Sequence, residues 1–504
     1  MSKPFSIHPM TVRLFNTLTG EVDPLVPIDG QALRMYACGP TVYDYGHIGN
    51  FRTFLQIDIL RRVLLLTGTP VRHVMNITDV DDKIIRNAAR DGVTVQEYTK
   101  KYRQAFVEDS DSLNIEHPEL LVNATDHINE MARFIAKLVE RGYAYRTDDG
   151  SYYYRIAKFP DYGKLSKKDF AGMTDGARVD LDEYDKDNAR DFALWKAPKP
   201  GEASWDTVIG PGRPGWHIEC STMSMKYLGD SFDIHCGGED LIFPHHENEI
   251  AQSEAESGKP FVHVWVHSRF LLVEGEKMAK SAGNFFTVRD LILMGHKPSS
   301  IRFLLMSVPY RKQLNFTFDG LTQAANSVER LRNFKLRLET SQFPDGSSET
   351  IAAIARKTSA EITAALNDDL NTARALGTVF DMVRDVNAAA DAGEVRQGDV
   401  PALLKTLEQF EEIFAVLKDD DAAKVRAVVD WAKQGGLADK ISPETAELAK
   451  AATLSDEEIE KLVAEHSAAR KARDFARSDA IRAQLADNGI ILENTKDGVR
   501  WKRK

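Results

Sequence analysis

The sequence predicts an α/β fold built on a parallel sheet, with an insertion, an α-helical bundle after it and a small C-terminal domain. The sheet is indicated by an apolar strand–helix–strand pattern over residues 34–77 and by a second alternating stretch over 216–268. Beyond residue 349 the chain becomes Ala-rich and helical. Because 504 residues exceed what one core can organise, we expect three or four domains of ~100–200 residues each.

The first unit is a βαβ pattern. Residues 34–37 form a short apolar strand that stops at Cys38, and from about Gly49 apolar side chains recur every three or four residues, as in a helix. Residues 71–77 are the second strand. A right-handed crossover makes the two strands parallel, and ligands gather at the carboxyl ends of such strands. The segments 38–50 and 76–82 both fall there.

The rest of the chain divides by composition. Residues 147–215 are turn-rich and acidic, then rich in Pro and Gly, which is typical of an insertion. A long helix is predicted over about 320–338, and 341–349 is the best linker candidate. The predicted units are 1–146 and 216–275 (the two halves of a Rossmann-like catalytic domain), 147–215 (a connective insertion), 276–340, 350–435 (the helical bundle) and 443–504 (the final domain).

Composition excludes several classes of protein. No apolar run reaches the ~18–20 residues of a membrane span, and the N-terminus lacks the pattern of a secretion signal. Three cysteines are too few for a disulfide framework, so we expect a reducing cytoplasm and thiols free for metal. The net charge of −11 argues against indiscriminate nucleic-acid binding. Residues 466–504 nevertheless carry ten Lys/Arg against five acids.

Two short motifs indicate nucleotide chemistry. His47-Ile48-Gly49-Asn50 opens a helix, where free backbone N–H groups and an imidazole can meet phosphate, and Gly49 allows close approach. Lys277-Met278-Ala279-Lys280-Ser281 lies on a Gly-flanked loop that can hold a pyrophosphate. Alone, the first could be a simple helix cap and the second an exposed basic turn. As a pair, they resemble the ATP signatures of class I aminoacyl-tRNA synthetases, although Asn50 replaces the usual His and Ala279 the usual Ser.

Metal-ligand residue types are scattered through the sequence. His245 and Glu249 are four residues apart, so on a helix both point from one face. Cys38 ends a strand, and Cys220 is far from it in the chain, so no local zinc motif exists. From these residues alone, buried structural cysteines and a solvated helix face remain open alternatives.

Four blocks, residues 38–44, 76–83, 215–220 and 243–249, resemble those of the cysteinyl-tRNA synthetases and occur in the family's order. The resemblance implies a class I synthetase fold that activates L-cysteine with ATP and Mg²⁺ and transfers it to tRNA(Cys). It also implies one Zn²⁺ per chain, because a thiolate ligand separates cysteine from serine where shape cannot. The implied zinc ligands are Cys38, Cys220, His245 and Glu249.

The same resemblance assigns the remaining site residues. Cys236 matches no ligand position, and a core Trp and a plain Gly turn remain alternatives for two of the assignments, Trp216 and Gly238. The implied residues are His47, Lys277 and Lys280 for catalysis; His47, Gly49, Asn50, Gly238, Asp240 and Lys280 for ATP; and Gly39, Thr78 and Trp216 for cysteine.

The basic C-terminal region resembles the family's anticodon-binding module over residues 468–475, 480–482 and 501–504. Aromatic and arginine side chains can stack on splayed bases, so Arg473, Phe475 and Trp501 are the predicted tRNA contacts. A solvated basic helix is the alternative. The family also implies a monomer.

Two other functions stay open. A related ligase joins cysteine to an amino-sugar in mycothiol synthesis, but it lacks the full C-terminal RNA domain that this chain's length and basic tail favour. A non-catalytic RNA-binding paralogue would be expected to lose a metal ligand or a signature lysine, and none is lost here.

Overall fold

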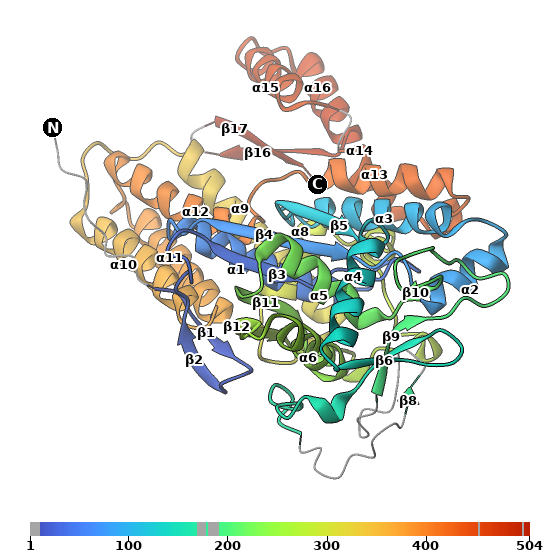
Figure 1. Ribbon diagram of the computed structural model, residues 1–504. Helices are drawn as coiled ribbons and strands as arrows, with labels where there is room; N and C mark the ends of the chain where they lie inside the picture. Colours follow the sequence, from blue (N-terminus) through green and yellow to red (C-terminus); the bar gives the residue numbers. More distant parts are fainter. Residues whose placement is uncertain (1–10, 169–177, 180–190, 452–453, 496–497, 504) are drawn as a thin grey trace.

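The computed structural model describes residues 11–168, 178–179, 191–451, 454–495 and 498–503. At the centre of this part lies a five-stranded parallel sheet in the order β12–β11–β3–β4–β5 (Figure 1). This confirms the predicted α/β fold with a parallel sheet. The strands are β3 (Leu33–Ala37), β4 (Val71–Ile77), β5 (Leu120–Asn123), β11 (Phe232–Gly238) and β12 (Val262–Ser268).

Helices cover both faces of this sheet, which is why its strands are apolar on both sides. The helix α1 crosses from β3 to β4 and packs on the face next to the helical bundle, and α5 packs against β3 and β4 with α4 and α6 beside it. The bounds of these helices are α1 (Ile48–Leu66), α2 (Asp82–Asp91), α3 (Val95–Ser112), α4 (Ile128–Glu140), α5 (Trp216–Leu228) and α6 (Glu247–Ser257).

The insertion forms its own small sheet in the order β10–β9–β7–β6, with β8 beside β9. The acidic stretch 182–187 lies outside the described residues. A second feature, a hairpin of β1 and β2, precedes the central sheet and was not predicted. These strands are β1 (Arg13–Asn16), β2 (Glu21–Pro24), β6 (Ala144–Arg146), β7 (Tyr152–Tyr154), β8 (Arg178–Val179), β9 (Asp191–Lys196) and β10 (Arg213–Pro214).

After the central sheet the chain becomes mainly helical. The long helix predicted over 320–338 is α9 (Phe318–Thr340), and the next helix begins at Glu349, so residues 341–348 connect the two helices. The bundle is built from α10 (Glu349–Asn367), α11 (Thr372–Asp391) and α12 (Val400–Phe414). Before it lie β13 (Leu271–Val273), β14 (Glu276–Lys277), α7 (Val288–Leu293), α8 (Pro298–Met306) and β15 (Leu314–Phe316).

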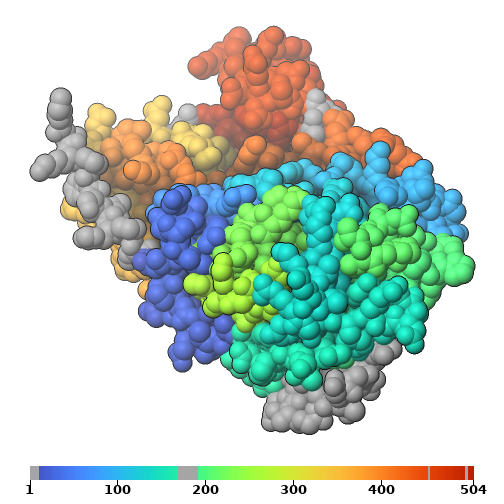
Figure 2. Space-filling model, viewed as in Figure 1, coloured from blue at the N-terminus to red at the C-terminus, as the bar shows by residue number. Residues whose placement is uncertain are grey.

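The end of the range predicted for the bundle, 350–435, contains a further helix, α13 (Asp421–Gln434), which packs on α7 and α8. Beyond α14 (Pro443–Lys450), the elements α15 (Asp456–Lys471), α16 (Phe475–Asp487), β16 (Ile490–Thr495) and β17 (Gly498–Arg503) surround a small core of their own. This C-terminal unit projects at the top of the molecule (Figure 2).

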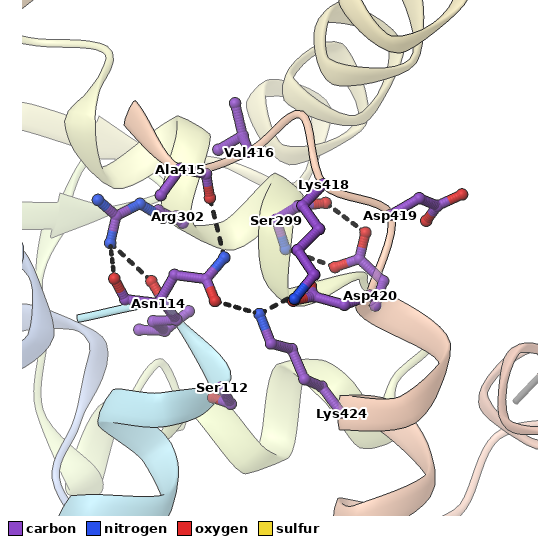
Figure 3. Close-up of polar contacts among 12 residues, drawn as sticks. Ser112, Asn114, Ser299, Arg302, Ala415, Val416, Lys418, Asp419, Asp420 and Lys424 are labelled. Carbon is purple, nitrogen blue, oxygen red and sulfur yellow. Dashed lines mark hydrogen bonds and ion pairs between the residues drawn. The ribbon is translucent and has the colours of Figure 1, made fainter. Parts of the chain in front are cut away.

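A buried arginine joins the bundle to the sheet domain. Arg302 of α8 is fully buried and donates to the carbonyl oxygens of Leu113 and Phe414 at 2.7 and 2.6 Å, and to Asp58 at 2.7 Å. Figure 3 shows Arg302 beside the loop that connects α12 to α13. In the part of the chain that the structure describes, no helix is long and apolar enough to cross a membrane.

Candidate functional site

A cavity of about 550 Å³ opens at the carboxyl ends of the central strands, where the sequence places the site. Residues from distant parts of the chain line it, including both ATP-type motifs and most of the predicted metal ligands. The predicted residues along its wall are Cys38, Gly39, His47, Gly49, Asn50, Thr78, Trp216, Cys220, Gly238, Asp240, His245, Lys277 and Lys280.

His47 is the N-cap of α1. Its Nδ1 accepts the backbone N–H of Asn50 at 3.2 Å, and the Asn50 side-chain oxygen accepts the N–H of His47 at 3.1 Å. Burial lowers the pKa of His47 to about 4, so the ring is neutral at pH 7. Since Nδ1 accepts, the proton is on Nε2. The amide Nδ2 of Asn50 is not used by the cap and remains a donor.

Glycine is required where the chain passes close to this wall. A Cβ on Gly39 would lie 1.7 Å from the carbonyl oxygen of Asn76, and one on Gly49 would lie 2.9 Å from the His47 ring. The N–H of Gly39 donates to the Asn76 side chain at 2.9 Å. Any side chain at Gly39 therefore displaces the next strand.

The loop Gly275–Asn284, called the signature loop below, lies against α1. The N–H of Ile48 donates to the carbonyl of Phe286 at 3.0 Å, and His47 meets the Phe285 ring edge-on at 5.1 Å. Lys280 forms an ion pair with Asp44 and lies 5.0 Å above the centroid of Phe285. The two motifs, about 230 residues apart in the sequence, thus share one wall.

The four predicted zinc ligands come together in a buried cluster, with all ligand atoms within 4.8 Å of one another. The Sγ atoms of Cys38 and Cys220 are 3.8 Å apart, and His245 Nε2 lies 3.1 Å from Glu249 Oε1. Two thiolates at ~2.3 Å from a tetrahedral Zn²⁺ lie about 3.8 Å apart. The donor set therefore fits zinc in chemistry and in spacing.

His245 and Glu249 meet although the helix is shorter than predicted. The helix α6 begins at Glu247, and His245 lies in the turn before it, where Phe243 is extended (φ −138°, ψ 132°). Spacing along a regular helix alone therefore does not account for their contact. The turn brings the imidazole next to the carboxylate.

Charges within the cluster shift its pKa values. Burial favours the neutral form of Glu249, but His235 and His245 outweigh it and lower the Glu249 pKa to about 2. Burial likewise opposes the thiolate of Cys220, yet the hydrogen bond from Cys38 brings its pKa to about 6. Burial and Cys220 raise the pKa of Cys38 well above its usual range. Burial opposes the charged form of His245, but Glu249 and Cys220 outweigh it and raise the His245 pKa to about 10, so without a metal the imidazolium balances part of their negative charge. A bound cation would take the place of that proton.

Four further histidines, which the sequence analysis missed as site residues, surround the cluster. The Nδ1 atoms of His217 and the ligand His245 lie 2.9 Å apart. His235 meets Glu249 Oε2 at 2.8 Å, and His246 joins Cys38 (3.3 Å) to His267 (2.8 Å). A second set, Cys38, His235, His246 and Glu249, is equally compact. Both sets share Cys38, which lines the cavity, but only the first set adds two further lining residues, Cys220 and His245, whereas His235 and His246 do not line it. His235 and His267 lie on β11 and β12, which are adjacent only in the fold, so no sequence spacing could reveal them. His246 follows His245 in the block 243–249, and that position was its one signal in the sequence.

The predicted cysteine contacts lie beside the metal cluster. Thr78 donates to Glu219 at 2.9 Å and accepts from Asn76 at 3.1 Å, which fixes its hydroxyl. The Trp216 ring lies 4.2 Å from that of His245, centroid to centroid. Thr78 thus gives this part of the cavity a polar surface, and the Trp216 ring closes it on one side.

The predicted tRNA contacts lie far from this cavity along the chain. Phe475 is 61% exposed at the start of α16, and Arg473, which precedes it by two residues, has a left-handed backbone (φ +60°). Trp501, on β17, is half-buried and lines a larger cavity of about 1330 Å³ between the C-terminal unit and α9. Phe475 is therefore the aromatic ring most open to a partner.

Comparison with known sequence families gives two matches. Residues 24–326 match the family "tRNA synthetases class I (C) catalytic domain", and residues 361–418 match the "DALR domain". The curated cysteine–tRNA ligase of Koribacter versatilis is 74% identical over 98% of this chain and 100% of its own length. The cysteine–tRNA ligase of Solibacter usitatus is 54% identical over the same shares.

Among solved structures, the chain resembles the Mycobacterium tuberculosis methionyl-tRNA synthetase in complex with methionyl-adenylate. The TM-score is 0.55 at 14% identity, covering 85% of this chain and 95% of that one. At this identity the likeness concerns the fold.

Proposed function

Because this chain belongs to the cysteine–tRNA ligases, a family of class I aminoacyl-tRNA synthetases, we propose that the Cys–Cys–His–Glu cluster at its cavity selects the amino acid. The chain joins cysteine to tRNA, with ATP as the energy source. The proposal is carried by one observation: Cys38, Cys220 and His245 are both members of a compact buried donor set and part of the cavity wall.

Cys38, Cys220, His245 and Glu249 would hold one Zn²⁺. When bound, this ion binds a substrate thiolate far better than a hydroxyl, so it separates cysteine from serine without an editing domain. Three residues complete the cysteine subsite. Gly39 has no side chain to fill the wall, Thr78 presents a fixed hydroxyl, and Trp216 closes the pocket.

The ATP subsite is assigned to the opposite part of the wall. The first-turn N–H groups of Ile48 and Asn50 are already engaged by Phe286 and His47. The N–H of Gly49, the positive end of the α1 dipole and the Nε2–H of neutral His47 would therefore meet the anionic phosphate chain. Gly49 and Asn50 allow and support that approach, and Gly238 and Asp240 receive the nucleoside. Lys277 and Lys280 stabilise the charge that builds up as pyrophosphate leaves, together with Mg²⁺ carried by ATP.

The remaining proposals concern the tRNA contacts, the oligomeric state and the cellular compartment. Residues 276–340 would contact the tRNA stem, and the C-terminal unit would read the anticodon through Arg473, Phe475 and Trp501. We further propose a monomer acting in the cytoplasm, where a reducing medium keeps the three free cysteines reduced.

The two alternatives from the sequence lose support. A mycothiol-type cysteine ligase and a non-catalytic paralogue both predict a chain that departs from the tRNA ligases in its C-terminal half or its site. This chain instead matches them over 98% of its length, and all four ligand residues and both lysines are at the cavity or its metal cluster.

The proposal is tested with two cysteine-to-serine variants. Cys220→Ser should lose bound zinc and cysteine-dependent ATP–pyrophosphate exchange, whereas Cys236→Ser, an equally buried cysteine outside the ligand set, should keep both. Metal analysis of the purified chain and the exchange assay give the result, with thermal melting to check folding. One zinc per chain and normal exchange in Cys220→Ser would reject the ligand assignment.

A further inference from the structure

The cavity wall includes an aromatic residue outside both motifs. Tyr45 lies between the block of residues 38–44 and His47 in the sequence, and it lines the cavity together with Tyr102. The two rings meet edge-to-face, with centroids 5.2 Å apart. Because Tyr45 is two residues before the N-cap of α1, its position constrains the backbone that leads into His47.

The other side of Tyr45 is packed by a residue from a distant part of the chain. Trp431, on α13, meets the Tyr45 ring edge-on at 5.6 Å and an angle of 78°. Residue 431 lies outside both matched family segments, 24–326 and 361–418. The nucleotide wall is thus supported from outside the catalytic domain.

The guanidinium of Arg289 contacts both the Tyr45 and the Trp431 rings. Arg289 of α7 lies 4.4 Å above the Trp431 ring and 5.3 Å from that of Tyr45. It is 4% exposed and donates to Asp109 and Glu108, each at 2.7 Å. A cation held in this way cannot swing out, so it keeps the Trp431 ring in place.

The start of α13 is anchored as firmly as its middle. Asp421 accepts from the backbone and hydroxyl of Ser299 at 2.8 and 2.6 Å. Lys424 donates to Asn114 at 2.6 Å and pairs with Asp420 at 2.9 Å (Figure 3). The helix is therefore a rigid support and not a loose connector.

We infer that Trp431 is a positioning residue for the nucleotide: by packing on Tyr45 it holds the segment that leads into His47 in its binding geometry. This inference rests on the proposed ATP subsite. It adds a residue that contacts neither ATP motif, and it makes α13 part of the active-site architecture as well as the route to the C-terminal unit.

Pyrophosphate exchange with the full chain tests the inference. An aromatic pair contributes about a threefold to tenfold effect, so Trp431→Leu should raise KM for ATP by about that factor and leave KM for cysteine unchanged. Trp431→Phe, which keeps a ring, should stay within about twofold of the wild type. Normal exchange by the wild type establishes the proposed function separately, so failure of the two ideas can be told apart.

Two controls separate positioning from general packing. Val425→Ala removes a fully buried side chain from the same helix and should leave KM for ATP unchanged. Tyr45→Leu combined with Trp431→Leu should be no worse than Tyr45→Leu alone, since both remove one contact. An unchanged KM for ATP in Trp431→Leu, an equal rise in Val425→Ala, or multiplying effects in the double variant would overturn the inference.

Discussion

At the scale of single residues, His73 is a buried imidazole with no task in the site. It lies on β4 at 2% exposure, and neither ring nitrogen has a hydrogen-bond partner among the described residues. Burial lowers its pKa to about 4, against 6.5 for an exposed histidine. Between these two pH values the unfolded chain binds a proton that the folded chain does not, so stability falls as pH falls through this window.

His73→Leu should therefore make the protein less sensitive to acid. From pH 7.5 to pH 5 the wild type should lose about 2 kcal/mol of unfolding free energy through this one residue, and the variant should be spared that loss. Urea unfolding at both pH values measures the difference. His263→Leu, at an exposed position of β12, is the control and should behave as the wild type; an equal acid loss in His73→Leu would refute the assignment.

At the scale of elements, the signature loop is held in shape by hydrogen bonds from one of its own side chains, Asn284. Asn284 accepts the N–H of Ala279 at 2.8 Å and donates to the carbonyl of Lys277 at 3.2 Å. The loop is bounded by Gly275 (φ +83°) and Gly283 (φ +69°), whose left-handed backbones favour glycine. Lys280 therefore sits on a preformed loop, and we expect it to exchange Asp44 for phosphate when ATP binds.

Lys280→Ala should lower kcat for pyrophosphate exchange by about 10²–10³-fold, as for loss of one preorganised charge donor. KM for cysteine should change little, because the lysine acts on the departing pyrophosphate. Lys259→Ala, which removes a surface lysine paired with Asp230, should have no effect. A parallel rise in KM for cysteine would show that Lys280 supports binding and not the transition state.

The sequence predicts elements well where local pattern and burial agree. Residues 71–77 were predicted as a strand and form β4 with these bounds, since an apolar run in a parallel sheet is buried on both faces. The sequence predicted residues 421–434 only as the end of the helical bundle, whereas they form a helix, α13, that packs on α7 and α8. Arg302 could not be predicted either: an arginine is expected at the surface, and its partners are backbone carbonyls assembled only by folding.

In the candidate site, too, some residues could be predicted from the sequence and others could not. The resemblance to the cysteinyl-tRNA synthetases implied Cys38, Cys220, His245 and Glu249, and the fold brings them together. Their outer partners His235, His246 and His267 come from β11, the turn before α6, and β12. Only the pairing of β11 with β12 makes His235 and His267 neighbours, so a pattern along the chain carries no signal for these two, whereas His246 directly follows the predicted ligand His245.

At the scale of the whole molecule, the C-terminal unit has a hydrophobic core separate from that of the part of the chain that holds the cavity. The unit has a core of its own, formed by Ile459, Val463, Ile481, Leu485 and Ile490. Phe475, at 61% exposure, belongs to neither core and has no packing role that would explain an exposed aromatic ring. Changes there should therefore affect recognition of the acceptor without disturbing amino-acid activation.

Phe475→Ala should leave cysteine-dependent pyrophosphate exchange at the wild-type level and lower kcat/KM for aminoacylation of tRNA. Stacking of one base on an aromatic ring contributes about 1–3 kcal/mol, so the loss should be about fivefold to 150-fold. Phe475→Tyr keeps the ring and should restore most of it. If both assays fell together, the C-terminal unit would act on the cavity itself; if neither fell, Phe475 would not be the ring that meets the tRNA, and Trp501 would be the next candidate.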